Sequence, residues 1–332
     1  MATKTHIRTG AAAALVLAAT ILASQARPAS AEPGGRCGTA RTLLTVGAPA
    51  LSVTRTLGHA AALPAAYDWP VKPFDQQHPV RAFLDDPRIG KNGTHAFHFG
   101  IDVSAPDGTP VYAVEAGEVF FDSGEAIAVV AGPSHEFGYW HIVPAVKSHQ
   151  HVERHRLLGT IAKGWEHVHF AERLNGDYIN PLRPGGLGPY GDTTPPEIAQ
   201  ISLAKTGDGS LAVLANAYGT PSLPVPGAWA DLPVTPALLR WRVVRDGRSV
   251  GGWRTAADFS GRMLDQTQFH SIYTPETQQN HKGQPGIFCF YLSQSWKPSD
   301  GSYEIEVQAS DTRDNQVDAV LELSVDNGKV RS

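Results

Sequence analysis

A histidine-rich segment in the first half of the chain carries the residue types best suited to binding a divalent metal. It opens at His98 and Asp102 and closes at His167 and His169. Residues two apart on a strand leave the same face, so the two closing imidazoles can address one centre. His98 and Asp102 would lie ~13 Å apart on a straight strand, so the backbone must turn between them, and Gly100 permits such a turn.

The types of these residues indicate a catalytic rather than a structural metal. Two histidines and a carboxylate, with a fourth position left to water, form the ligand set typical of a catalytic zinc. The segment contains no cysteine. It also lacks a His-Glu-x-x-His motif, because His135-Glu136 is followed at the required position by Tyr139. A catalytic base would therefore have to come from a residue other than the glutamate of that motif.

The order and spacing of these residues resemble those of the lysostaphin/LytM-like zinc metallopeptidases. The similarity extends from about Trp69 to Pro181, roughly a third of the chain. The motifs that carry it are His98-x-x-x-Asp102, Tyr139-Trp-His141 and His167-Val-His169-Phe, with Gly108-Thr-Pro-Val-Tyr and Gly117-Glu-Val between the first two.

The resemblance implies a role for each residue of the motifs. It implies that His98, Asp102 and His169 hold Zn²⁺, and that His141 and His167 flank the metal-bound water as the catalytic pair. It also implies the family's fold, an antiparallel β barrel-like sandwich with the zinc in a groove across it. All five positions are filled, so nothing in the motifs argues for an inactive relative.

Two features near the motifs bear on substrate choice and regulation. The family usually carries a Gly-Ser/Thr-rich loop before His-x-His, whereas this chain has Lys163-Gly-Trp-Glu166, which predicts a bulkier and more acidic cleft wall. Some members place an upstream asparagine in the metal site. Asn92 precedes His98, but Asn92-Gly-Thr is typical of a turn, so the sequence does not support autoinhibition.

A second group of histidines has strand spacing but different surroundings. His149, His151 and His155 lie in a polar, charged run at 147–156 with few apolar neighbours. Such residues collect in loops. We therefore interpret this run as a solvated loop rather than a second metal site.

The first 31 residues have the pattern of a secretory signal peptide. Lys4 and Arg8 precede an apolar run at 11–23, and Ala29-Ser-Ala31 follows as a cleavage site. The run is too short to span a bilayer. We expect a mature chain that begins at Glu32 and is secreted, extracellular or cell-wall-associated, without stable membrane insertion.

Charge and cysteine content narrow the partners and the compartment. The formal net charge is −4, so bulk charge does not draw the protein to nucleic acid, and we expect no nucleic-acid partner. Cys37 and Cys289 are the two cysteines. A single bridge is allowed in an oxidising compartment, but two unpaired thiols remain the alternative because the sequence gives no distance.

The chain is long enough for two domains after the signal peptide. We predict a poorly ordered extension at 32–65, a LytM-like peptidase domain at 66–182, a Pro/Gly linker at 183–196 and a second domain at 197–330. Short β-rich runs in the first domain end at Gly, Pro or Asp. They span 110–114, 118–122, 126–130, 137–143, 159–162 and 167–171.

The second domain shows strict alternation of apolar and polar residues. Odd-numbered apolar positions at 303–309 and 317–325, separated by a turn at 311–315, predict an antiparallel hairpin with one buried face. Further β-rich runs at 199–204, 211–215, 239–244 and 287–292 predict an immunoglobulin-like β-sandwich, so the fold class is mainly β. We expect most of Trp229, Trp241, Trp253 and Trp296 to be buried core rather than a sugar platform.

Three functions agree with these features. The first is a secreted zinc metalloendopeptidase that hydrolyses peptide bonds in peptidoglycan cross-links. The second is a peptidase that acts on other extracellular peptides, and the third is a non-catalytic cell-wall-binding or regulatory module that retains the fold. The sequence does not name the scissile bond or the partner of the second domain.

Overall fold

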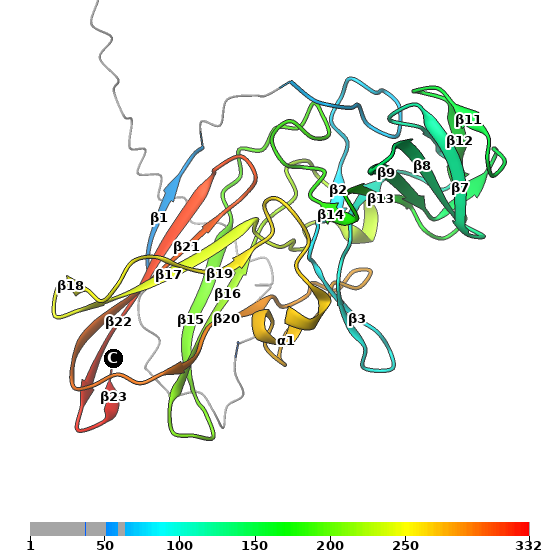
Figure 1. Cartoon of the computed structure of the whole chain (residues 1–332). Coiled ribbons are helices and arrows are strands. Elements are labelled where there is room, and N and C mark those ends of the chain that lie inside the picture. The colour runs from blue at the N-terminus through cyan, green and yellow to red at the C-terminus, as the bar shows by residue number, and fades with distance from the viewer. Residues whose placement is uncertain (1–36, 38–50, 59–63, 332) are drawn as a thin grey trace, which may run out of the picture. The chain divides into compact units, whose positions relative to one another are not determined.

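Antiparallel β-strands make up nearly all the regular structure in the part of the chain that the structure describes (Figure 1). This computed structural model describes Cys37 and residues 51–58 and 64–331. The mainly β fold class is therefore confirmed. The predicted signal peptide and most of the predicted extension lie outside the described residues.

The strands from β2 (Val80–Ala82) to β14 (Asp177–Ile179) form what we call the first module, and its largest sheet carries the predicted metal-binding residues. Its strands follow the order β11-β7-β8-β9-β13-β5-β2, and β14 pairs with β13. The sheet has β11 and β2 at its edges, so it is open rather than closed into a barrel. The strands are β2 (Val80–Ala82), β5 (Ile101–Ser104), β7 (Gly117–Ser123), β8 (Ala126–Gly132), β9 (His135–Trp140), β11 (His151–Val152), β13 (His167–Leu174) and β14 (Asp177–Ile179).

Two smaller sheets complete the first module. One has the order β10-β12-β6 and the other is the β3-β4 hairpin. Their strands are β3 (Pro87–Ile89), β4 (His95–Phe97), β6 (Pro110–Tyr112), β10 (Ile142–Pro144) and β12 (Leu157–Ile161). The core shared by the β10-β12-β6 sheet and the largest sheet is apolar and aromatic, with Tyr139, Phe137 and Phe170 fully buried.

The predicted strand at 137–143 is wrong in one respect, because it is two strands. His141 separates β9 from β10 and has φ of 64°. A left-handed residue turns the chain out of the extended conformation, so the ladder stops there. The Ala162 amide donates a hydrogen bond of 2.8 Å to the His141 carbonyl, which holds the turn.

The second module, which consists of β1 (Ser52–Thr56) and the elements from β15 (Glu197–Lys205) to β23 (Lys329–Arg331), contains two sheets that share one core. One has the order β15-β16-β20, and the other has the order β1-β22-β21-β17-β18, with β19 beside β17 and β23 beside β22. The strands are β1 (Ser52–Thr56), β15 (Glu197–Lys205), β16 (Leu211–Tyr218), β17 (Leu238–Arg245), β18 (Arg248–Ser249), β19 (Arg254–Asp258), β20 (Cys289–Trp296), β21 (Gly301–Ser310), β22 (Gln316–Asp326) and β23 (Lys329–Arg331). Its short helices are η1 (Gly227–Trp229), η2 (Gln266–Gln268) and α1 (Phe269–Ile272).

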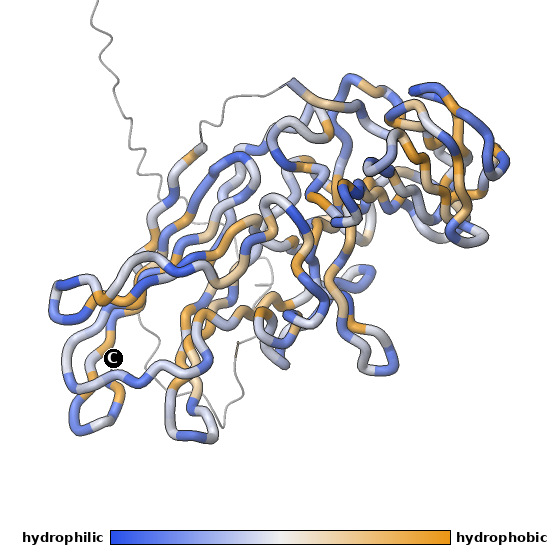
Figure 2. Tube along the Cα trace, viewed as in Figure 1, coloured by the Kyte–Doolittle hydropathy of each residue, from blue (hydrophilic) through white to orange (hydrophobic). Residues whose placement is uncertain are grey.

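The predicted hairpin is present as β21 and β22. Ile305, Val307 and Ala319 are fully buried, as the odd-numbered alternation predicted. Figure 2 shows the apolar and polar residues that alternate along these strands. Val213 of the other sheet belongs to the same apolar core, so the two sheets pack together; an immunoglobulin-like topology stays a prediction.

The expectation for the tryptophans is wrong for most of them. Trp241 is buried in the core, but Trp229, Trp253 and Trp296 are only partly buried. Arginine guanidinium groups lie over three of the four rings, with Arg81 4.0 Å from the centre of Trp229. These rings pack against cations, which alternation alone does not reveal.

The segment expected to be poorly ordered contains a strand. β1 pairs with the edge of β22, with Ser52 opposite Val320 and Thr56 opposite Gln316. Backbone hydrogen bonds to an open sheet edge order this segment, and such pairing needs no apolar pattern.

Cys37 and Cys289 form a disulfide with their Cα atoms 5.5 Å apart.

The predicted Pro/Gly linker lacks regular structure but is packed. Leu187 is 2% exposed and belongs to the first core. The Trp69 indole donates a hydrogen bond to the Pro189 carbonyl, and the Arg313 guanidinium donates one to the Tyr190 carbonyl. The predicted domain boundaries stay a prediction.

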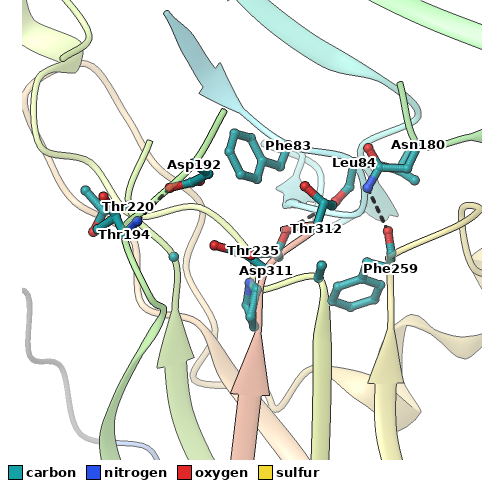
Figure 3. Close-up of a pocket in the computed structure, with 13 residues that line it drawn as sticks. Phe83, Leu84, Asn180, Asp192, Thr194, Thr220, Thr235, Phe259, Asp311 and Thr312 are labelled. Atoms are coloured by element: carbon teal, nitrogen blue, oxygen red, sulfur yellow. Dashed lines mark hydrogen bonds between the residues drawn. The ribbon is translucent and has the colours of Figure 1, made fainter. Parts of the chain in front are cut away.

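The loop between β2 and β3 is bonded to the second module through two buried aspartates. The Thr235 amide donates to Asp86 Oδ1 at 2.8 Å, and the Leu264 amide donates to Asp85 Oδ1 at 3.2 Å. Figure 3 shows Thr235 close to Leu84 in this region. Phe97 of β4 is buried in the core of the second module, so the two modules share apolar packing as well as hydrogen bonds.

No helix in the described residues is long and apolar enough to cross a membrane.

Burial of Asp85 leads to a prediction about stability. Burial raises the pKa of Asp85 from 3.8 to about 8, so between these values the folded state holds a proton that the unfolded state releases. The free energy of unfolding must then fall as pH rises from about 4 to 8. We expect Asp85→Asn to reduce this pH-dependent fall in the free energy of unfolding by at least about 1.4 kcal/mol, which is the equivalent of one pKa unit.

Urea denaturation at pH 5 and pH 8 measures this effect. Asparagine tolerates the left-handed conformation of Asp85, whose φ is 64°. Asp231→Asn is the matched control, because Asp231 is exposed and also left-handed. Equal pH dependence in the wild type and Asp85→Asn would contradict the prediction.

Candidate metal centre

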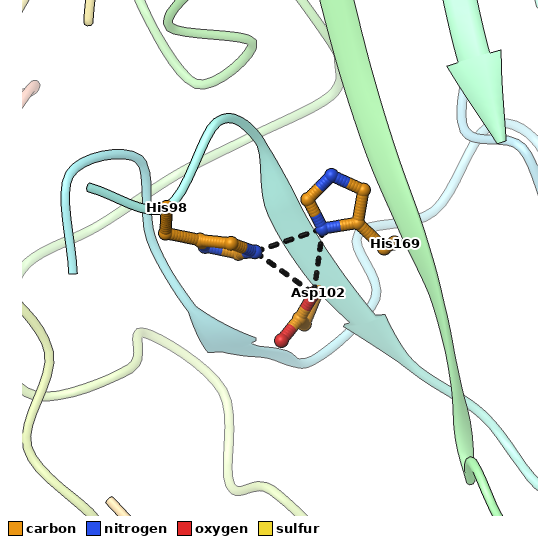
Figure 4. A group of neighbouring side chains, drawn as sticks. All are labelled: His98, Asp102 and His169. Carbon is orange, nitrogen blue, oxygen red and sulfur yellow. Dashed lines mark hydrogen bonds and ion pairs between the residues drawn. The ribbon is translucent and has the colours of Figure 1, made fainter. Parts of the chain in front are cut away.

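His98, Asp102 and His169 converge on one point, and all three are buried (Figure 4). Their candidate ligand atoms all lie within 4.8 Å of one another. Strands β5 and β13 pair with Asp102 directly opposite His169, and directly opposed residues project from the same face. His98 joins them from the turn that precedes β5.

The distances in this group fit a tetrahedral zinc ion. His98 Nε2 lies 2.8 Å from His169 Nδ1. Asp102 Oδ1 lies 3.2 Å from His98 Nε2 and 3.1 Å from His169 Nδ1. Zinc bonds of 2.0–2.1 Å in tetrahedral geometry place ligand atoms about 3.3 Å apart. Two imidazole nitrogens and a carboxylate oxygen are therefore the right donors at nearly the right separations.

Hydrogen bonds from the loop before β3 orient His98. Its Nδ1 lies 2.8 Å from the Phe83 carbonyl, which can only accept, so Nδ1 carries the proton and Nε2 presents its lone pair to the centre. The Asp85 amide donates to the His98 carbonyl, and the His98 amide donates to the Asp86 carbonyl. The loop that bonds to the second module thus also fixes a candidate ligand.

Gly100 lies in a bend before β5, as expected, and also has a second role. Its φ is not in the left-handed region. A Cβ atom there would overlap the Phe170 carbonyl oxygen and would lie 3.0 Å from His169 Nε2. The glycine is needed because β5 and β13 approach closely, and this approach brings Asp102 to His169.

His141 and His167 lie beside the three candidate ligands. The rings of His141 and His167 are 4.8 Å apart, and the His141 ring is 6.3 Å from that of His169. His167 Nε2 lies 3.3 Å from Asp102 Oδ1. The structure therefore brings all five motif residues together.

The loop that departs from the family pattern forms a wall beside His141. The Trp165 ring stacks on the His141 ring at 3.5 Å and is 39% exposed. Glu166 forms an ion pair of 2.8 Å with Lys282 of the second module. The wall is bulky as predicted, and its acidic residue is paired with a cation.

Burial sets the charge states of the site. It lowers the pKa of His169 to about 4, and burial together with the neighbouring His167 lowers the pKa of His141 to about 3. Burial alone would raise the pKa of Asp102, but the imidazoles of His167 and His98 hold that pKa well below its usual value. Neutral imidazoles and an ionised carboxylate are the forms that bind a metal.

The sequence analysis did not identify two arginines that lie in the site. Arg88 Nη2 lies 3.3 Å from Asp102 Oδ2, and Arg81 Nη2 lies 2.7 Å from His167 Nδ1. Neither belongs to a motif, and an arginine on a short strand is ordinary. Tertiary contacts alone identify them.

Other histidines and the candidate asparagine lie elsewhere. His149, His151 and His155 are exposed, as predicted, but the run is not entirely a loop, because His151 begins the short edge strand β11. Asn92 lies in the β3-β4 turn, where its Oδ1 accepts hydrogen bonds from Thr94. These contacts agree with the interpretation of Asn92-Gly-Thr as a turn.

Comparison with known proteins supports a zinc site. Residues 96–181 match the model of peptidase family M23. No curated protein is significantly similar to the chain. Together with the His98-Asp102-His169 group, the family match supports Zn²⁺ as the cofactor.

Several solved structures contain chains similar to part of this one. A chain of the SpoIIQ-SpoIIIAH pore-forming complex is 17% identical over 35% of this chain and 89% of its own, with a TM-score of 0.30. A zinc-containing peptidase from Vibrio cholerae is 19% identical over 39% and 45%, with a TM-score of 0.30. The catalytic domain of the prophage-encoded M23 protein EnpA from Enterococcus faecalis is 24% identical over 38% and 98%, with a TM-score of 0.25. The match thus spans less than half of the Vibrio cholerae chain.

The donor set predicts that Asp102 is required for metal binding. We expect Asp102→Ala to lower zinc affinity at least ~100-fold, because even residues that only support ligands contribute 10- to 100-fold. Plasma emission on the purified protein measures the zinc content. His149→Ala, an exposed histidine, is the control, and a full equivalent of zinc in Asp102→Ala would contradict the assignment.

The close approach at Gly100 predicts a second effect on the metal. We expect Gly100→Ala to push β5 from β13 and to weaken zinc binding about 10-fold or more, as misplaced ligands do. Competition with a zinc-sensitive dye measures the affinity. Gly124→Ala is the matched control, since a Cβ there meets no atom within 4 Å; equal affinities in both variants would show that the approach does not matter.

Proposed function

Since residues 96–181 form a peptidase family M23 domain, we propose that the chain is a secreted zinc metalloendopeptidase that cleaves peptide bonds in peptidoglycan cross-links. One observation carries the proposal: two further imidazoles, of His141 and His167, lie beside three convergent metal donors. Three protein donors leave a position for water, as in catalytic zinc sites. A purely structural site would not need the adjacent pair.

His98, Asp102 and His169 would hold the zinc. When bound, the ion polarises the scissile carbonyl and lowers the pKa of water to about 7. His141 and His167 share the proton transfers of the hydrolysis. One imidazole takes a proton from the attacking water as the carbon-oxygen bond forms. The same group then returns this proton to the leaving amine as the carbon-nitrogen bond breaks. The other imidazole donates a hydrogen bond to the carbonyl oxygen as its negative charge grows.

The sequence and the disulfide support the proposed secretion, and the sequence supports the proposed substrate. The N-terminal pattern of a signal peptide supports secretion. The Cys37–Cys289 disulfide agrees with an oxidising compartment. The resemblance to the lysostaphin/LytM-like enzymes supports a peptidoglycan peptide as substrate, and the wall at Trp165 would narrow the choice of peptide.

The mechanism predicts that both imidazoles are needed for turnover but not for the metal. We expect His141→Ala and His167→Ala each to keep one zinc and to lose at least ~100-fold in turnover, the low end for a general acid or base. Release of free amino groups from a cross-linked peptide measures the rate. His149→Ala should match the wild type, and near wild-type rates in both site variants would contradict the mechanism.

The substrate is tested by digesting purified peptidoglycan and identifying the new amino termini by mass spectrometry. New termini within cross-link peptides would support the proposal. Cleavage of unrelated extracellular peptides, with intact peptidoglycan, would favour the broader peptidase. Full zinc content without turnover on either substrate would favour a non-catalytic module.

A further inference from the structure

Arg81 is a buried cation directly behind one of the catalytic histidines. It lies at a bulge of β2, where the register with β5 shifts between Val80 and Ala82. Such bulges re-aim side chains next to active sites. The Arg81 side chain turns inward, is 8% exposed, and places Nη2 2.7 Å from His167 Nδ1.

The surroundings of Arg81 hold it with few polar contacts. Its guanidinium stacks on the ring of Trp229, a residue of η1 in the second module, at 4.0 Å. Within the described residues, its Nη1 is buried and has no hydrogen-bond partner. Burying a cation costs free energy unless it is well paired. The hydrogen bond to His167 is therefore important for stabilising the buried guanidinium.

The contact between Arg81 and His167 defines where the imidazole proton lies. A guanidinium only donates hydrogen bonds and stays protonated in proteins. His167 Nδ1 must therefore accept, which leaves the proton on Nε2. At the other end of the ring, Nε2 lies 3.3 Å from Asp102 Oδ1. An ionised carboxylate only accepts, so both ends of the ring favour the same tautomer.

One contact favours the opposite tautomer. The Trp165 carbonyl oxygen also lies 2.7 Å from His167 Nδ1 and would accept a proton from it. Nδ1 cannot donate to Trp165 and accept from Arg81 at once. Charge-assisted hydrogen bonds are about twice as strong as neutral ones, and an unpaired buried charge costs more than an unpaired carbonyl. The bond from Arg81 therefore prevails.

We propose that Arg81 is a positioning residue that keeps the His167 proton on Nε2, so that His167 donates to the developing oxyanion and His141 accepts the proton of the attacking water. The catalytic part of this statement rests on the proposed peptidase function. The placement of the proton does not. Trp229 supports Arg81 from the second module, which gives that module a role in the site.

The placement of the proton is tested by NMR on zinc-loaded protein labelled with ¹⁵N-histidine at neutral pH. Long-range ¹H–¹⁵N correlations distinguish the two tautomers, and His167→Gln identifies the His167 signals by their loss. We expect the Nε2–H form in the wild type and in Arg81→Lys, which keeps a charged donor. We expect Arg81→Met to shift His167 to the Nδ1–H form, because Trp165 is then its remaining partner at Nδ1.

Several results would overturn the proposal. In the wild type, an Nδ1–H tautomer of His167 or protons on both of its ring nitrogens would overturn it, even if Arg81→Met does not fold. In a folded Arg81→Met protein, an unchanged Nε2–H tautomer of His167 would also overturn it. These outcomes do not depend on turnover, so they are separate from a failure of the peptidase function.

Kinetics test the catalytic part. We expect Arg81→Met to lower kcat about 10- to 100-fold, the usual effect of a residue that orients a site group, with little change in KM or zinc content. Arg81→Lys should restore most of the rate, and Trp229→Leu should lower kcat in the same direction. A raised KM with unchanged kcat would mean that Arg81 binds substrate and would overturn its positioning role.

Discussion

The site depends on the register between β5 and β13. This pairing sets Asp102 opposite His169 and lets the two strands approach closely at Gly100. Because side chains alternate along a strand, a slip of one residue would turn one of the two donors to the opposite face. The neighbouring strand β9 then ends with Trp140 opposite His169, which brings His141 to the same centre. One sheet register therefore positions most of the chemistry.

The rest of the site is held from outside this sheet. The loop that orients His98 is bonded through Asp85 and Asp86 to the second module. The same module supplies Trp229 against Arg81 and Lys282 against Glu166. A residue that supports a ligand through a buried hydrogen bond affects both stability and chemistry. The second module therefore contributes to the geometry of the candidate centre, whatever else it binds.

Prediction from sequence succeeded where the signal was local and periodic. The hairpin of β21 and β22 follows from strict alternation, and β6 to β10, β12 and β13 follow from β-rich runs that end at glycine, proline or aspartate. The strands β2 to β5, of which β5 carries Asp102, were not predicted. It failed where a single residue left the pattern for a tertiary reason. His141 interrupts a β-rich run because its left-handed backbone turns there, and β1 forms because β22 offers an open edge. Neither cause is visible in a local pattern.

The kinds of donor and the shared face of His167 and His169 follow from the sequence alone, because residue type and the two-residue period of a strand are local properties. The resemblance to the lysostaphin/LytM-like enzymes identified all five residues that converge. The tertiary structure was needed to establish that Cys37 reaches Cys289, that two strands approach closely at Gly100, and that Arg81 contacts His167. Each of these contacts joins residues that are far apart in the sequence and become neighbours in the folded chain. Their distances are set by sheet order and packing, which a linear pattern does not encode.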